Sequence, residues 1–178
     1  GALAGFFVAK IGARRAVLMA VAVSSALSLL QGLEMSFGVF MATRILEGFG
    51  HLLLVVALPT MMAALAKPSD KSVVMGLWGT FFGVGYALLA FVIPSIEAWG
   101  GVRAVYVGHG LLLAAILPVV WLCLPRVMAA GGVMPNFIAV HRAIYANPSY
   151  FAPGLGHGIY TAIFIALVAF LPAKLDAI

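Results

Sequence analysis

Charged residues are scarce in this chain, at 8 %, whereas hydrophobic residues make up 65 %. Soluble globular domains carry about 25 % charged residues, so this scarcity excludes an ordinary water-soluble fold. The few charges are ten Lys and Arg against five Asp and Glu, and they are spread between apolar runs. Such a distribution is typical of loops in a membrane protein, and nucleic acid is not an expected partner.

Cysteine is almost absent, because Cys123 is the only one. A single cysteine excludes an intrachain disulfide and a multi-cysteine metal site. The chain also lacks a GxSxG serine context, an HExxH pair and a GxxxxGK phosphate-binding loop. His51, His109 and His157 have no paired spacing, which disfavours a metal or haem site. We therefore expect no enzymatic activity, no cofactor and no metal.

Long apolar runs, in contrast, occupy most of the sequence. About 20 apolar residues are needed to cross a hydrocarbon core of about 30 Å. The sequence therefore predicts an all-α, polytopic membrane helix bundle, with spans near residues 16–33, 39–66, 73–96, 103–124 and 150–172. The opening "GALAGFFV" is too short to span, so we expect it to be the end of a helix.

Basic residues alternate between the two sides of these spans. Lys and Arg are enriched in short cytoplasmic loops. One side collects Lys10, Arg14, Arg15, Lys67, Lys71, Arg126 and Arg142, and the other has Arg103 and Lys174. Loops 9–15, 67–72 and 125–149 are therefore expected in the cytoplasm. Apolar residues near helical spacing from Phe137 to Tyr145 are compatible with a short interfacial helix or with an ordinary connector.

Three ionisable residues, Arg44, Glu47 and His51, interrupt the apolar run "ATRILEGFGHLLLVV". A charge at the bilayer centre costs at least about 2.5–3.5 kcal/mol on insertion scales. At about 100° per residue the three side chains lie within about 60° on one helix face, where Arg44 can pair with Glu47, and Glu47 with His51. They are predicted either to serve a proton or solute pathway, or only to lock this helix to its neighbours.

Other polar or small residues inside the predicted spans have less specific interpretations. A compact polar patch contains His157, Tyr160 and Thr161. Interhelical hydrogen bonds are predicted for Ser24, Ser25, Ser28 and Gln31. An interfacial position suits Tyr86, Tyr106 and His109. Close helix packing is predicted at Gly48, Gly76, Gly79 and Gly83.

The most specific pattern is the loop "GFFVAKIGARR", with Gly5, Lys10, Gly12, Arg14 and Arg15. It resembles the loop between helices two and three of the major facilitator superfamily, although Ala9 stands where that family usually has Asp. "RILEGFG" resembles the family's fourth-helix pattern, with Glu47 in place of Gln. "WGGVRAVYVGHGLLLAAI" is similar to the outer turn into helix six, and "ALVAFLPAKL" to the end of helix seven.

This resemblance implies part of a twelve-helix transporter, from the end of helix two through helix seven. Residues 1–124 then belong to the N-terminal bundle, 125–149 form a cytoplasmic inter-bundle loop, and 150–178 begin the C-terminal bundle. The implied function is secondary active transport of a small solute by alternating access, coupled to protons; the alternative is a membrane scaffold or an intramembrane enzyme. The loop motif is then a conformational gate, and helix seven, with His157 and Tyr160, lines the pathway.

Expected partners are a small solute, protons, the lipid bilayer and the remainder of the chain. The intramembrane Arg44 favours an anionic solute. The expected location is the inner (plasma) membrane of a bacterium.

Overall fold

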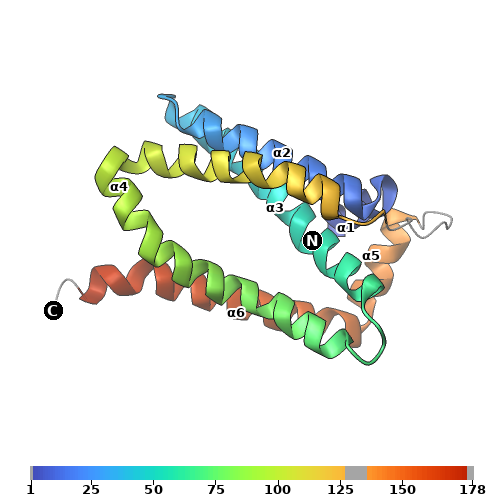
Figure 1. The fold of residues 1–178 in the computed structure, drawn as a ribbon. Coiled ribbons are helices and arrows are strands. Elements are labelled where there is room, and N and C mark those ends of the chain that lie inside the picture. Colours follow the sequence, from blue (N-terminus) through green and yellow to red (C-terminus); the bar gives the residue numbers. More distant parts are fainter. Residues whose placement is uncertain (1, 127–135, 176–178) are drawn as a thin grey trace. The chain divides into compact units, whose positions relative to one another are not determined.

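The computed structural model describes residues 2–126 and 136–175, and all regular elements within them are α-helices. The chain divides into two units, residues 1–132 and 133–178, which are described separately. The first unit contains α1 (Ala2–Ile11), α2 (Ala13–Gln31), α3 (Phe37–Leu65) and α4 (Lys71–Cys123), and the second contains α5 (Phe137–Ala146) and α6 (Pro148–Leu175) (Figure 1). The expected all-α architecture is confirmed.

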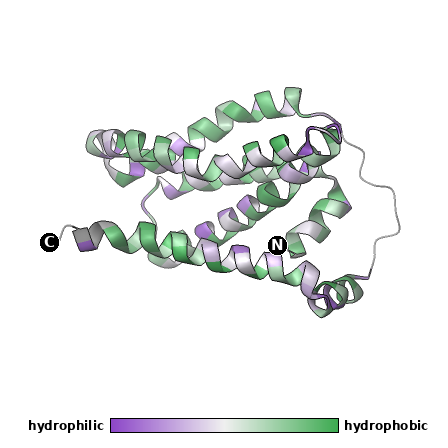
Figure 2. Ribbon diagram, turned by 90° about the horizontal axis from the view of Figure 1, so that it is seen from below, coloured by the Kyte–Doolittle hydropathy of each residue, from purple (hydrophilic) through white to green (hydrophobic). Residues whose placement is uncertain are grey.

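Within the described residues, four helices are long and apolar enough to cross a membrane: α2, α3, α4 and residues Pro148–Leu171 of α6. Figure 2 shows that hydrophobic positions predominate along the helices. A helix that is apolar on all sides is stable in the hydrocarbon core of a bilayer, because its backbone hydrogen bonds are made within the helix. The chain is thus a multi-pass membrane protein.

The helix α4 contains two of the predicted spans. A straight helix of its 53 residues would measure about 80 Å, far more than a bilayer core. Gly100 and Gly101 interrupt the helical backbone, and Gly101 has a φ of 68°, which a glycine adopts without strain. Residues 71–99 form a first arm and residues 102–123 a second arm, with the turn where the sequence predicts it (Figure 1).

The core of the first unit lies where α2 packs against α3 and the second arm of α4 (Figure 1). Its buried residues include Ala16 and Ala20 of α2 and Ala57 of α3. Small side chains let helices approach closely, which is how helices associate in lipid. The first arm of α4, in contrast, has no buried residue.

Two glycines inside helices mark close helix approaches. A Cβ at Gly50 of α3 would lie 2.9 Å from Ser24 Oγ, and one at Gly110 of α4 would lie 2.9 Å from the backbone nitrogen of Leu29. The four predicted packing glycines are different, because a Cβ at any of them meets nothing within 4 Å of the described chain: Gly48, Gly76, Gly79 and Gly83. Their packing role stays a prediction.

The second unit joins a short helix to a long one. Asn136 caps α5, since its side-chain oxygen accepts hydrogen bonds from the amides of Ile138 at 2.9 Å and Ala139 at 3.4 Å. Asn147 accepts a hydrogen bond from the amide of Ser149 at 3.0 Å, where α6 begins. Of the two alternatives for residues 137–145, the structure shows a short helix. Its position at the membrane interface stays a prediction.

Candidate functional site

Six polar or aromatic residues from α2, α3 and α4 form one group, called here the Glu47 cluster: Ser28, Gln31, Arg44, Glu47, Tyr106 and His109. Glu47 is its buried centre, with 8 % of its surface exposed. Oε2 of Glu47 accepts hydrogen bonds from Arg44 Nη1 and, at 3.1 Å, from Gln31 Nε2. Oε1 lies 3.7 Å from Nδ1 of His109. One carboxylate therefore links three helices.

Arg44 is the accessible cation of the Glu47 cluster, because 46 % of its side chain is exposed. Its Nη1 donates to Glu47 and lies 3.5 Å from Gln31 Oε1, and its guanidinium carbon lies 5.9 Å from the centre of the Tyr106 ring. Within residues 2–126 and 136–175, Nε and Nη2 have no hydrogen-bond partner. Arg44 is thus anchored through one nitrogen and open at the others.

Hydroxyl groups of α2 tie this helix to the second arm of α4. Ser25 donates a hydrogen bond to the carbonyl of Gly110 at 2.8 Å, and Ser28 donates to the carbonyl of Tyr106 at 2.9 Å. Together with the Gln31–Glu47 bond, these contacts confirm the interhelical hydrogen bonds predicted for Ser25, Ser28 and Gln31. The bond predicted for Ser24 is not found among the described residues.

Tyr106 and His109 are the members of the Glu47 cluster that sequence reasoning missed. An interfacial position suited both, whereas the structure places them against Arg44, Glu47 and Ser28. One available signal was their spacing of three residues, which puts both side chains on one face of a helix. Nothing in the sequence says which neighbouring helix that face meets.

The structure places His51 outside the Glu47 cluster, although it is only one turn further along α3. His51 is exposed, and among the described residues the contacts of Glu47 go to Gln31, Arg44 and His109. His51 is also the middle residue of Phe37–Leu65. It therefore lies on an open part of α3 near the centre of the span.

His157 and Tyr160 lie on α6, in the second unit. Both are exposed, and their rings are 6.5 Å apart with an angle of 32° between the ring planes. Tyr160 also stacks on Phe164, with ring centres 6.4 Å apart. The predicted aromatic and polar patch is therefore present on α6, and its role stays a prediction.

The basic loop between α1 and α2 contacts the end of α4. Gly12 has a φ of 88°, which permits the sharp turn between the two helices. Arg14 donates hydrogen bonds to the carbonyls of Leu124 at 3.0 Å and Trp121 at 2.6 Å. These carbonyls have no partner further along the helix, and a cation stabilises the negative end of the helix dipole.

The other motif residues of the predicted gating loop make no comparable contact among the described residues. Lys10 and Arg15 are exposed, with Lys10 in the last turn of α1, and a Cβ at Gly5 meets nothing within 4 Å. Arg14 is thus the motif residue that fixes the loop to a helix end within the first unit. Gating by this loop stays a prediction.

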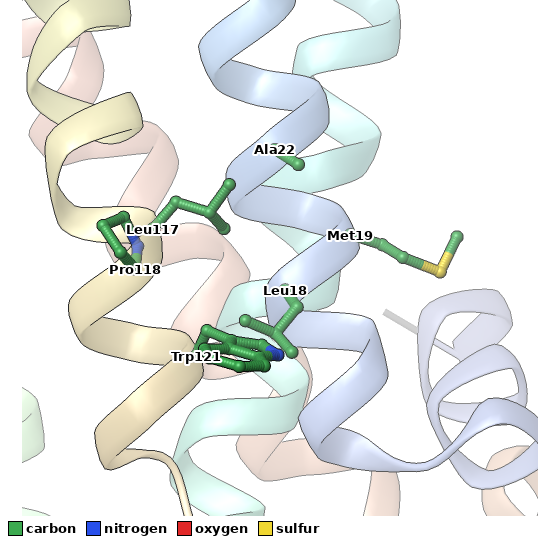
Figure 3. A pocket seen from close by; sticks show the side chains of 6 residues that line it. All are labelled: Leu18, Met19, Ala22, Leu117, Pro118 and Trp121. Atoms are coloured by element: carbon green, nitrogen blue, oxygen red, sulfur yellow. The ribbon is translucent and has the colours of Figure 1, made fainter.

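Two hollows lie between α2 and the second arm of α4. One, of about 370 Å³, shares Gln31 and Tyr106 with the Glu47 cluster and also has Glu34 and Arg103 in its wall. The other, of about 500 Å³, has only apolar lining residues: Leu18, Met19, Ala22, Leu117, Pro118 and Trp121 (Figure 3). A groove with no polar group cannot orient a polar solute, whereas the first hollow adjoins groups that can.

The helices and the Glu47 cluster define a class, namely a multi-pass α-helical membrane protein with ionisable groups inside its spans. Comparison with protein families gives the narrower assignment, since the model of the Major Facilitator Superfamily matches residues 1–174. The chain therefore belongs to this superfamily and is a membrane transporter. Comparisons with curated proteins and with solved structures give no match.

Proposed function

We propose that this transporter moves a small anionic solute by alternating access and couples the movement to protons. The observation that carries the proposal is the Arg44 guanidinium, which is anchored on one side and open on the other. A cation inside a membrane span is expensive, and such residues typically mark solute or ion pathways. The ion pair with Glu47 lowers this free-energy cost and leaves most N–H donors of the guanidinium available to a solute.

The free nitrogens of Arg44 suit an anion with two oxygens. A guanidinium carries five N–H donors in a planar fork, and Nη1 is the nitrogen engaged by Glu47 and Gln31. The edge formed by Nε and Nη2 matches the spacing of a carboxylate or a phosphate, which arginine binds through two parallel hydrogen bonds. Carboxylates and phosphates are therefore the favoured solute classes.

The open face of α3 supports a pathway near the centre of the membrane. His51 is exposed at the middle of the helix, Gly48 has open space around it, and Arg44 lies about 10 Å from His51 along the helix axis. Secondary transporters bind their solutes near the midplane, between helical bundles that rock about the site. The sequence lacks a phosphate-binding loop, so we propose that an ion gradient supplies the energy.

The test uses the full-length chain in proteoliposomes that contain the pH-sensitive dye pyranine. Mono-, di- and tricarboxylates and inorganic phosphate are added outside with and without an imposed pH gradient, and a neutral sugar serves as the comparison. We expect at least one anion to move protons with it. Uptake that ignores the pH gradient would refute proton coupling, and the absence of uptake for every anion would refute an anionic solute.

Variants of Arg44 test the site itself. Charge-assisted hydrogen bonds are worth about 1.5–3 kcal/mol, so Arg44→Gln should lower anion uptake about tenfold to a hundredfold. Arg44→Lys keeps the charge but loses the fork, and it should retain intermediate uptake. The double variant Arg44→Gln/Glu47→Gln removes both charges, so a folding defect from an unpaired buried carboxylate is separated from lost binding.

The matched control is Arg142→Gln on α5, which removes an exposed cation outside the long spans. It should leave uptake unchanged. Wild-type uptake in Arg44→Gln, at equal protein in the membrane, would overturn the assignment of this residue.

A further inference from the structure

His109 lies close enough to Glu47 for a charge on its ring to act on the Glu47 cluster. It belongs to the second arm of α4, and 47 % of its side chain is exposed. Its Nδ1 lies 2.8 Å from Ser28 Oγ on α2 and 3.7 Å from Glu47 Oε1 on α3. A single imidazole nitrogen therefore faces a hydroxyl from one helix and a carboxylate from another.

The hydrogen bonds of Ser28 indicate which nitrogen of His109 holds a hydrogen. Ser28 has one hydroxyl hydrogen, and its oxygen lies 2.9 Å from the carbonyl of Tyr106, which can only accept. When Ser28 donates that hydrogen to the carbonyl of Tyr106, its Oγ can only accept a hydrogen bond from His109. Nδ1 of His109 therefore carries the ring hydrogen. The neighbouring carboxylate favours the same tautomer. Nε2 is then the nitrogen that can take up a proton.

The two oxygens of Glu47 serve different partners. Oε2 accepts from Arg44 and Gln31, while Oε1 faces His109. When His109 is neutral, Arg44 is the cation that balances the carboxylate. When a proton binds at Nε2, the ring becomes a second cation against the same carboxylate. Because one carboxylate then faces two cations, the electrostatic attraction between Glu47 and the guanidinium of Arg44 weakens.

Few other charged groups surround His109. From α3 it faces Glu47, with Arg44 beyond, and on its own helix Tyr106 lies one turn away. From α2 it faces the uncharged Ser28, because the charged residues of α2, at positions 14 and 15, lie towards the opposite end. Glu34 and Arg103 line the hollow that adjoins the cluster. The Glu47–His109 pair therefore brings a carboxylate of α3 next to an imidazole of α4.

We propose that His109 is a proton-binding residue of this transporter, and that a proton at its Nε2 releases Arg44 from Glu47 to bind the anion. This inference rests on the proposed function, because it assigns the proton site that accompanies the Arg44 anion site. Proton and anion then bind together and cross in the same direction. Reciprocal coupling of two such sites changes affinity by about 5- to 150-fold, so a proton on His109 should raise anion affinity by that factor.

One experiment detects the proton site without any solute. The infrared difference spectrum of the full-length chain between pH 8 and pH 5 should contain an imidazole band and a shifted Glu47 carboxylate band. In His109→Asn, whose amide can replace Nδ1–H but cannot be protonated, the imidazole band should weaken, because three other histidines remain, and the Glu47 change should disappear. The matched control His141→Asn, on α5, should keep the Glu47 change. Persistence of the Glu47 change in His109→Asn would overturn the proposal.

A second measurement tests the coupling to anions. Binding of the carboxylate panel to the detergent-solubilised full-length chain is followed between pH 8 and pH 5. Wild type and His141→Asn should bind about 5- to 150-fold tighter at the lower pH, whereas His109→Asn should bind with a flat pH profile. A wild-type profile in His109→Asn would overturn the inference. Failure of the proposed function is different, because it removes anion uptake in wild type while leaving the infrared changes intact.

Discussion

The close approach of α2 and α4 at Gly110 gives a quantitative prediction for Gly110→Ala. A Cβ built at Gly110 would lie 2.7 Å from Leu29 Cγ and 2.9 Å from the Leu29 backbone nitrogen, whereas ordinary contacts are 3.4–4 Å. The leucine side chain could rotate away, but the backbone nitrogen can move only if α2 moves. The same movement strains the hydrogen bond from Ser25 to the Gly110 carbonyl, which is 2.8 Å long.

The size of the effect follows from three contributions. Forcing extra volume into a packed contact costs about 1–3 kcal/mol, and the strained hydrogen bond is worth about 1 kcal/mol. Replacing glycine by alanine inside a helix returns up to about 1 kcal/mol. We therefore expect Gly110→Ala to be destabilised by about 1–4 kcal/mol.

Gly108→Ala is the matched control on the same helix, because a Cβ there meets nothing within 4 Å. It should be neutral, or more stable by up to about 1 kcal/mol. The gain in helix propensity is common to both variants and cancels, so they should differ by about 2–4 kcal/mol. Thermal unfolding of the full-length chain in detergent measures both. A midpoint for Gly110→Ala at or above that of Gly108→Ala would refute the close approach of α2 and α4.

Two further predictions concern the loops. Arg14→Ala should speed amide hydrogen exchange in the last turn of α4, because it removes two hydrogen bonds to the helix-end carbonyls. Arg15→Ala should leave this exchange unchanged, and equal exchange in both variants would contradict the contact. In a Cys123→Ser background, Ser69→Cys should react with a membrane-impermeant maleimide from the cytoplasmic side and Trp99→Cys from the opposite side; labelling of both from one side would contradict the predicted orientation.

The helices themselves were predictable because the thickness of the bilayer sets the length of each apolar run. Apolar runs between polar loops gave the spans that became α2, α3 and α6, and the glycine pair at residues 100–101 gave the turn inside α4. The opening segment is indeed helical and forms α1. Which helix faces pack was not predictable in the same way. In lipid a helix is apolar on every side, so hydrophobic periodicity does not distinguish the packed face from the exposed one.

The packing glycines illustrate this difference. Gly48 and Gly50 belong to one motif, yet Gly50 meets α2 while Gly48 has open space around it. A rotation of about 200° around the helix axis separates two residues that are two positions apart. Sequence spacing gives this angle between them, but only the position of α2 decides which of the two is covered.

The candidate site was predictable only as far as one helix extends. The contact between Arg44 and Glu47 follows from their spacing of three residues, and the structure confirms it. Glu47 and His51 had an equally suitable spacing, but the carboxylate faces His109, which is distant in the sequence. The spacing of residues along a helix identifies the partners that a side chain can reach on its own helix. It does not tell whether a side chain from another helix will be the partner instead.

The position of Glu47 unites the two interpretations that its sequence left open. As a lock, it joins α3 to α2 through Gln31 and to α4 through His109, and it is buried as a structural residue would be. As part of a pathway, it orients the half-exposed Arg44. A lock made with a neutral amide would need no cation, whereas a buried carboxylate needs one. Arg44 and His109 are the two side chains placed to supply that charge, which is why we propose that a proton on His109 changes the interaction between Glu47 and Arg44.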